Sequence, residues 1–326
     1  MMKDSIDPIF PSIVETIHLG KNFIALPHIN IDGDDLGSML ALYWGFKKIN
    51  KNVALFTTDS IPFVYTFLPG VEKIRNFIPD RKFDAALMLE CSTPARLPAK
   101  INLKQIAHKV INLDHHPDNS AYGDLNYIDS KAAALGEIVY FLLKTLDVEM
   151  DYNIAVNLYT AILTDCGSFQ YSNTTSNTHK IVSELLKFPI DVNQISKKIY
   201  RETDFNTLKL LGEVLSTLDK TNDGKVVWAE VTPEMMKKYN AFEENTQHFI
   251  DSVNHTAGHE IAILFKETPE NTTKASVRSD IYPVNELSAE FGGGGHKQAA
   301  GCTINASLPE AKKLFLEKIN EMFYNK

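Results

Sequence analysis

The first half of the chain alternates short apolar runs with segments whose apolar residues recur at helical spacing. Leu36, Leu40 and Tyr43, for example, fall on one face of a helix. The predicted strands are residues 23–26, 53–56, 85–89 and 110–113, and further helices are predicted over 132–146 and 154–163. Strands that alternate with helices indicate a parallel sheet covered on both faces.

The second half predicts a smaller unit of mixed composition. Residues 187–206 are polar and mixed, as expected of a connection between domains. Beyond them, Leu208, Leu211 and Leu215 indicate a helix, and residues 226–231, 261–265 and 275–277 indicate strands. The predicted fold class is α/β, with an N-terminal parallel-sheet domain and a smaller mixed α/β C-terminal domain.

The charge balance argues against a protein that follows a long nucleic-acid duplex. The 326 residues carry a formal net charge of −8 and contain no basic block. Phosphate contacts supply most of the affinity for long nucleic acids, so their partners usually present a basic surface. A small phosphate substrate remains compatible with an acidic chain, because bound metal ions bring their own positive charge.

Cysteine usage and hydropathy predict a cytoplasmic protein without a membrane partner. The three cysteines, Cys91, Cys166 and Cys302, are widely spaced and form no CxxC pair, which argues against a disulfide framework. No apolar run reaches the roughly 20 residues of a membrane span. Residues 1–11 lack the basic and apolar segments of a secretory signal.

Two clusters of metal-ligating residue types follow predicted strands. His28, Asp32 and Asp34 lie in the loop after the first strand, where α/β sheets place ligands, and an imidazole with two carboxylates suits Mn²⁺ or Mg²⁺. The alternative is that Asp34 or Asp35 caps the following helix. The triplet formed by residues 114–116, an aspartate and two histidines, follows the fourth strand and favours a metal site over core packing.

Two weaker signals lie in the same predicted domain. Glu90 follows the buried strand 85–89, although a solvated acid explains it equally well. Asp165 ends an apolar helix, where the alternative is a helix C-terminal turn with Gly167 supplying the bend. All four clusters place oxygen or imidazole ligands at the ends of regular elements. Together they can supply two metal ions about 4 Å apart, as in phosphoryl-transfer enzymes.

A fifth cluster lies in the C-terminal domain. Residues 292–295 are four consecutive glycines, followed by His296 and a run of small residues that we interpret as the start of a helix. Glycine N–H groups and a helix N-terminus together would form an anion site. Upstream, Arg278 and Ser279 end a predicted strand and could hold a phosphate or carboxylate.

These motifs resemble those of the DHH/DHHA1 phosphoesterases, in the order found in that family. The first cluster is similar to motif I, Asp114-His115-His116 to the motif that names the family, and residues 277–279 with 291–301 to the DHHA1 signature. The resemblance covers about residues 10–320 and is greatest to the NrnA-like nanoRNase/pAp-phosphatase subgroup. It implies a DHH domain over 1–190, a linker over 191–206 and a DHHA1 domain over 207–326.

The resemblance also implies roles for individual residues. His28, Asp32 and Glu90 would bind one Mn²⁺, and a second Mn²⁺ would be bound by Asp34, Glu90, His115 and Asp165, with Mg²⁺ or Co²⁺ as other candidate ions. Glu90 would bridge, at a position where the family usually has the shorter Asp. Asp114 and His116 would orient groups or contact the substrate. The substrate's far end would be gripped by Arg278, Ser279, Gly293, Gly294, Gly295 and His296.

The resemblance predicts hydrolysis of short 5′-phosphorylated oligonucleotides such as pApA, and of 3′-phosphoadenosine 5′-phosphate (pAp). The substrate would lie in a cleft between the two domains, which limits its length, and a homodimer is the family expectation. A RecJ-like single-strand exonuclease is an alternative, although such enzymes are usually longer. A second alternative is a catalytically degenerate nucleotide-binding regulator, which only the Glu90 departure supports. Relatives that are pyrophosphatases lack the four-glycine signature.

Overall fold

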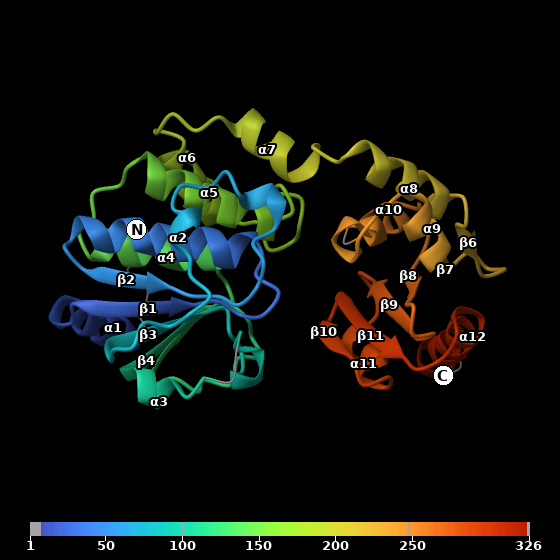
Figure 1. The fold of residues 1–326 in the computed structure, drawn as a ribbon, viewed down its shortest axis with the longest axis horizontal. Coiled ribbons are helices and arrows are strands. Elements are labelled where there is room, and N and C mark those ends of the chain that lie inside the picture. Colours follow the sequence, from blue (N-terminus) through green and yellow to red (C-terminus); the bar gives the residue numbers. More distant parts are fainter. Residues whose placement is uncertain (1–7, 99–100, 247, 325–326) are drawn as a thin grey trace. The chain divides into compact units, whose positions relative to one another are not determined.

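The computed structural model describes residues 8–98, 101–246 and 248–324, except for the side chain of His296. The chain divides into two compact units, Met1–Glu202 and Thr203–Lys326 (Figure 1). This division falls inside the segment 191–206 in which the sequence predicted a linker. Much of that segment is helical, because Ile195 anchors helix α7 (Val192–Tyr200) by burying its side chain.

The first unit is built on a five-stranded, fully parallel sheet in the order β2-β1-β3-β4-β5. The prediction of a parallel sheet is therefore confirmed, and the structure adds β5, a short strand whose residues are all half-buried. The strands are β1 (Asn22–Leu26), β2 (Asn52–Leu55), β3 (Phe83–Leu89), β4 (Ala107–Asp114) and β5 (Leu125–Ile128).

Alternate residues of these strands enter two different hydrophobic cores. Phe23 and Ala25 pack in the core that contains the apolar residues of α2 and α4. Ile24 and Leu26 pack in the smaller core beside α3, on the opposite face of the sheet (Figure 1). The helices of this unit, besides α7, are α1 (Ile9–Leu19), α2 (Gly33–Lys48), α3 (Leu103–Ile106), α4 (Leu135–Thr145), α5 (Tyr152–Asp165) and α6 (Ser176–Leu185).

The second unit has a six-stranded mixed sheet in the order β10-β11-β9-β8-β7-β6. Only β7 and β8 pair in parallel among its strands in the described part of the chain. Helices cover both faces, with Phe315 of α12 in one core and Val214 of α8 in the other. The strands are β6 (Asp219–Lys220), β7 (Val226–Val231), β8 (Ile261–Glu267), β9 (Thr273–Arg278), β10 (Gly294–His296) and β11 (Ala299–Ile304); the helices are α8 (Phe205–Leu215), α9 (Pro233–Lys238), α10 (Phe249–Asn254), α11 (Val284–Ala289) and α12 (Leu308–Ile319).

The sequence also predicted free cysteines and no membrane-spanning segment, and two observations concern these predictions. Cys91, Cys166 and Cys302 are buried and unpaired. None of the helices in the described residues combines the length and the apolarity that crossing a membrane requires.

Close packing between α2 and α5 depends on Gly37. A Cβ atom at this position would lie 2.5 Å from the backbone oxygen of Asn157 and 3.0 Å from Cβ of Ala161. The backbone of α5 cannot yield by a side-chain rotation, so the two helices approach only because position 37 has no side chain. Gly37 thereby fixes the distance between the start of α2 and the end of α5, which both carry acidic residues.

We expect Gly37→Ala to destabilise the protein by about 1–3 kcal/mol, because the added methyl group overpacks a helix contact. Denaturant unfolding of the metal-free chain measures the change. Gly212→Ala is the matched control, because Gly212 lies in α8 and an added Cβ there meets no atom within 4 Å. The free energy of unfolding of the control is expected to rise by up to about 1 kcal/mol, because alanine has a higher helix propensity than glycine. Equal responses of the two variants would contradict the packing argument.

Candidate metal centre

The parallel sheet brings three of the predicted clusters to one edge. His28 lies two residues beyond β1, Glu90 follows β3 directly, and Asp114 is the last residue of β4. These strands are neighbours in the sheet, and β2 and β3 lie on opposite sides of β1. Open α/β sheets bind their ligands at this kind of topological switch, beyond the carboxyl ends of the strands.

Three acids at the start of α2, Asp32, Asp34 and Asp35, have different roles. Asp32 is the N-cap, since its Oδ1 accepts hydrogen bonds of 3.0 Å from the backbone N–H groups of both Asp34 and Asp35. The alternative that Asp34 or Asp35 caps this helix is therefore wrong. An N-cap residue has extended backbone geometry that points its side chain back at the first turn, and Asp32 is the residue with that geometry. Asp34 and Asp35 are free to serve elsewhere, and both are buried.

Asp34 is held by the N-terminus of α4. Its Oδ2 accepts a hydrogen bond of 2.5 Å from the N–H of Leu135, and its Oδ1 accepts one of 2.9 Å from the N–H of Gly136. The hydroxyl of Ser38 donates a third, of 3.2 Å. These two N–H groups have no acceptor within their own helix, and the positive end of the helix dipole also favours a carboxylate at this position.

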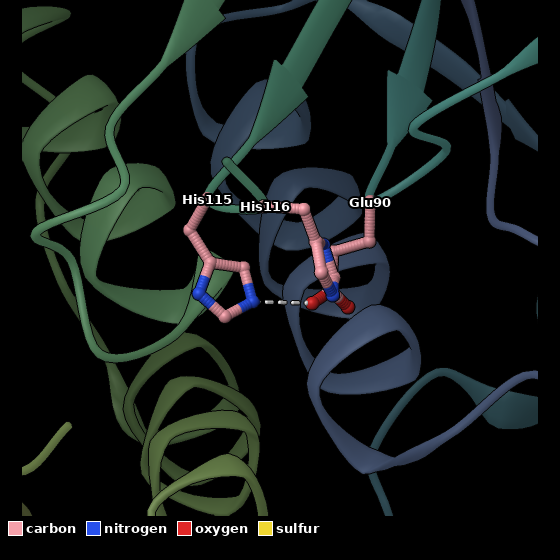
Figure 2. A group of neighbouring side chains, drawn as sticks. All are labelled: Glu90, His115 and His116. Atoms are coloured by element: carbon pink, nitrogen blue, oxygen red, sulfur yellow. Dashed lines mark hydrogen bonds and ion pairs between the residues drawn. The ribbon is translucent and has the colours of Figure 1, made fainter. Parts of the chain in front are cut away.

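Glu90 lies between the two halves of the centre. The residue is 1% exposed, and its backbone has a φ of +48°, a left-handed conformation that is uncommon for a residue with a side chain. Oε1 of Glu90 is 2.9 Å from Nε2 of His115, and Oε2 is buried without a hydrogen-bond partner among the described residues. Figure 2 shows both ring systems, of His115 and His116, turned toward this carboxylate.

Asp114 accepts hydrogen bonds from the two histidines that follow it. Its side chain is fully buried, and Oδ1 accepts hydrogen bonds from the backbone N–H groups of His115 and His116. The same oxygen lies 2.7 Å from Nδ1 of His116. Burial would raise the pKa of Asp114, but the hydrogen bond from His116 lowers it below its usual value, so the carboxylate accepts and the ring donates.

Asp165 completes the cluster from the end of α5. Its Oδ2 lies 3.7 Å from Nε2 of His115, while Oδ2 of Asp34 lies 4.0 Å from the same nitrogen. Gly167, two residues later, has a φ of +50° and ends the helix by a left-handed turn. The turn at Gly167 and the position of Asp165 beside His115 involve different residues, so the two interpretations of this segment are compatible.

Ligand atoms converge in three groups that share Glu90: a group of three with His115 and His116, and two groups of four, which are called the first and second ligand groups below. Within each group, the candidate ligand atoms all lie within 4.8 Å of one another. Glu90 Oε2 and Asp35 Oδ1 are buried oxygens without a partner in the described structure, as expected of atoms that a cation satisfies. The first group is His28, Asp32, Asp35 and Glu90, and the second is Asp34, Glu90, His115 and Asp165.

The electrostatics of the groups indicate a deficit of positive charge. Burial and neighbouring carboxylates raise the pKa of Asp34 and that of Glu90 well above the usual range. Burial also raises the pKa of Asp165 to about 6, although His115 opposes it. Burial alone would lower the pKa of His28, but Asp32 and Asp35 raise it to about 9. A divalent cation would remove this mutual repulsion, so the residues fit a metal centre.

Asp35 belongs to the first ligand group, although the sequence pattern does not predict it there. It stands beside Asp34 in the first cluster, where helix capping is the only role that the sequence suggests for it. Two consecutive acids at a helix start are ordinary on a solvated surface. The distinguishing signal is the complete burial of Asp35, which a single sequence does not reveal.

The glycine segment of the second unit differs from the prediction. Residues 299–304 form strand β11, which pairs with β10 in a hairpin, so the expected helix after the glycines is wrong. Ala300, Cys302 and Ile304 are buried in alternation, which is the period of a strand. A Cβ on Gly293 would lie 2.2 Å from the backbone oxygen of Gly301, so this glycine permits a close backbone approach.

The remaining predicted substrate contacts also lie in the second unit. Arg278 ends β9, and its Nη1 donates to the backbone oxygen of Val277. The hydroxyl of Ser279 donates to the backbone oxygen of Glu260 and accepts from the N–H groups of Ile281 and Tyr282, so it holds a turn. A Cβ added to Gly294 would meet no atom within 4 Å, and Gly295 has a φ of +140°. The side chain of His296 lies outside the described residues.

Comparison with known proteins places these units. The DHH family, N-terminal domain, matches residues 22–166, and the DHHA1 domain matches residues 209–325. The bifunctional oligoribonuclease and PAP phosphatase NrnA of Thermus thermophilus is 30% identical over 93% of this chain and 90% of its own length. The chain belongs to the DHH/DHHA1 family. The prediction made from the motifs is therefore confirmed.

A further relative and a solved structure are similar to this chain over nearly its whole length. The Bacillus subtilis bifunctional oligoribonuclease and PAP phosphatase NrnA is 24% identical over 94% of this chain and 96% of its own length. The crystal structure of an exopolyphosphatase-related protein from Bacteroides fragilis superposes with a TM-score of 0.91, at 23% identity, and covers 98% of both chains. The structural likeness establishes that the two proteins share a fold.

Proposed function

We propose that this chain is a two-metal phosphoesterase that hydrolyses short 5′-phosphorylated oligonucleotides such as pApA to mononucleotides, and pAp to AMP. The observation that carries the proposal is the pair of ligand groups that share buried Glu90 at the carboxyl ends of β1, β3 and β4. The named activities of the relatives from T. thermophilus and B. subtilis supply the substrate class.

The ions that best fit are two Mn²⁺ per chain, with Mg²⁺ or Co²⁺ as substitutes. Carboxylate oxygens dominate both ligand groups, which favours hard divalent cations over thiolate-preferring ones. Ions bound there would act as Lewis acids toward the phosphoryl group and supply an activated water at neutral pH. Within this proposal His28, Asp32 and Glu90 hold the first ion, and the second ion is held by Asp34, Glu90, His115 and Asp165.

The surrounding residues then position the reacting groups. Asp114 accepts hydrogen bonds from the backbone N–H groups of both histidines, and its contact with Nδ1 holds the ring of His116 in place. Because Nδ1 of His116 faces Asp114, Nε2 is the ring nitrogen that can orient the phosphate or give a proton to the leaving oxygen. His115 is oriented similarly, since its Nδ1 lies 3.3 Å from the backbone oxygen of Ala132.

The second unit contributes recognition of the nucleotide. Arg278 is suited to a bidentate contact with phosphate, and the open space at Gly294 permits close approach of a ligand. Ser279 would support this site indirectly, through the turn that it holds. A homodimer in the cytoplasm, with no membrane partner and no long duplex as substrate, completes the proposal.

The test is product release from pApA and from pAp, side by side, with Mn²⁺ and with excess chelator. The proposal expects AMP from pApA and phosphate from pAp, both lost with chelator. Degradation of long single strands at a comparable rate would favour a RecJ-like exonuclease. Binding of either compound without cleavage, in the presence of Mn²⁺, Mg²⁺ or Co²⁺, would favour the nucleotide-binding regulator.

A further inference from the structure

Asp35 lies where the first metal ion would be bound. Its side chain is completely buried, and Oδ2 lies 3.2 Å from Nε2 of His28, while Oδ2 of Asp32 lies 3.8 Å from that nitrogen. Nδ1 of His28 is already engaged with the backbone oxygen of Ile29, so Nε2 is its ligand atom. The three side chains therefore point their ligand atoms at one another around a common centre, together with Glu90.

One oxygen of Asp35 has a partner and the other has none. Oδ2 accepts a hydrogen bond of 3.1 Å from the backbone N–H of His28. Oδ1 is buried and has no hydrogen-bond partner in the described structure. A buried carboxylate oxygen without a partner is costly, and a bound cation is a physical means of satisfying it.

Helix geometry explains why two consecutive acids reach two different ions. Successive residues of an α-helix are rotated by about 100° around its axis. In the first turn of α2, Asp34 therefore points toward the N-terminus of α4 and His115, whereas Asp35 points toward His28 at the end of β1. The two acids diverge from one another, and Glu90 lies between them.

We propose that Asp35 is a fourth protein ligand of the first metal ion, beside His28, Asp32 and Glu90. This inference rests on the proposed metal centre. It gives both ions the same ligand composition of one imidazole and three carboxylates, with Glu90 shared. The five carboxylates of the two groups then exceed the charge of two divalent cations by one, which favours retention of both ions and a preference for Mn²⁺ or Mg²⁺.

The alternative role for Asp35 is to position His28 through hydrogen bonds, and the choice of variant separates the two. Asp35→Asn keeps an oxygen that can accept the N–H of His28, but removes the anionic ligand. Asp35→Ala removes both. A ligand role predicts that one of two Mn²⁺ ions is bound at least about tenfold more weakly in both variants. A positioning role predicts that the Asn variant binds as the wild type does.

The experiment is a Mn²⁺ titration of the full chain by calorimetry, with the bound metal counted after dialysis and the fold checked by circular dichroism. The expected result is two ions in the wild type and one in Asp35→Asn at the same free Mn²⁺. Glu137→Gln is the matched control, because Glu137 is 2% exposed in the same unit but lies outside both ligand groups. It is expected to retain two ions.

Two ions bound by Asp35→Asn with unchanged affinity would overturn the inference, whatever Asp35→Ala does. If the Asn variant failed to fold, Asp35→Ser would carry the test with the same two outcomes. The count does not depend on substrate turnover. A wild-type chain that binds no Mn²⁺ would refute the proposed metal centre itself, whereas two ions in both the wild type and Asp35→Asn would refute only the role of Asp35.

Discussion

Asp34→Ala is expected to abolish hydrolysis of pApA and of pAp, with kcat lowered by at least about 10³-fold. Asp34 belongs to the second ligand group, and loss of an ion that contributes several kcal/mol to the transition state corresponds to this factor. Stopped assays with Mn²⁺ measure the loss. The fold is expected to survive, because the variant also removes a buried acid whose pKa is raised by burial and by nearby carboxylates.

Two companion variants make the Asp34 result specific. Asp34→Asn keeps oxygen and nitrogen atoms near the N–H groups of Leu135 and Gly136, so it tests charge and not space. Asp84→Asn is the control, since Asp84 is an acid of the same sheet whose Oδ2 accepts from the N–H groups of Lys21 and Asn22, at the opposite strand ends. The control is expected to keep its activity. Turnover by Asp34→Ala at the wild-type rate would refute the metal assignment.

Removal of divalent ions is expected to lower the stability of the first unit. Mn²⁺ binds the folded ligand groups and not the dispersed residues of the unfolded chain, so each ion stabilises by about 2.7 kcal/mol when its free concentration is 100 times its Kd. Unfolding should therefore shift to higher temperature with Mn²⁺ and return with chelator. Asp34→Ala should show a smaller shift, since it lacks one complete ligand group.

The stabilisation by Mn²⁺ is expected to be larger at pH 8.5 than at pH 6. In the metal-free chain, the pKa of His28 is raised to about 9, so its contribution of roughly 3 kcal/mol is complete below about pH 6.5 and is lost as pH rises through 9. The raised pKa of Asp165, about 6, acts in the same direction, since its ionisation destabilises the folded chain from about pH 4 upward.

The stability of the metal-free chain falls as pH rises, whereas the stabilisation by bound Mn²⁺ grows. A cation replaces the protons that the folded ligands hold, so Mn²⁺ affinity rises with pH. Calorimetric unfolding at several pH values, with Mn²⁺ and with chelator, measures both effects. Two sets of curves that coincide at every pH would show that the ligand groups bind no ion. Asp84→Asn should retain the same Mn²⁺-dependent shift as the wild type, because Asp84 lies outside both groups.

The sequence determined the elements and the chemistry at their ends. Apolar runs such as residues 85–89 and helical spacing such as that of Leu36 and Leu40 are local patterns, and they sufficed to predict four strands of the parallel sheet and the helices α2, α4 and α5. The predicted ligand residues lie at or near the ends of regular elements, so their residue types and positions were also visible without a structure. The motif resemblance then determined the family.

Other features depended on contacts between distant segments, and only the tertiary structure decided them. The N-cap role of Asp32 and the burial of Asp35 follow from how α2 meets the strands, since neighbouring acids in a sequence carry no mark of which one is buried. The convergence of both ligand groups on Glu90 requires β1, β3 and β4 to be aligned in one sheet.

The segment after the four glycines was predicted wrongly because its local pattern does not reveal its pairing partner. Small residues such as Ala299 and Ala300 favour a helix over a strand by local propensity, but pairing with β9 over six positions decided for the strand. The sequence by itself therefore determined which residues follow each strand and what they could ligate. The tertiary structure decided which of them face a common centre, because convergence is a property of long-range packing and not of local spacing.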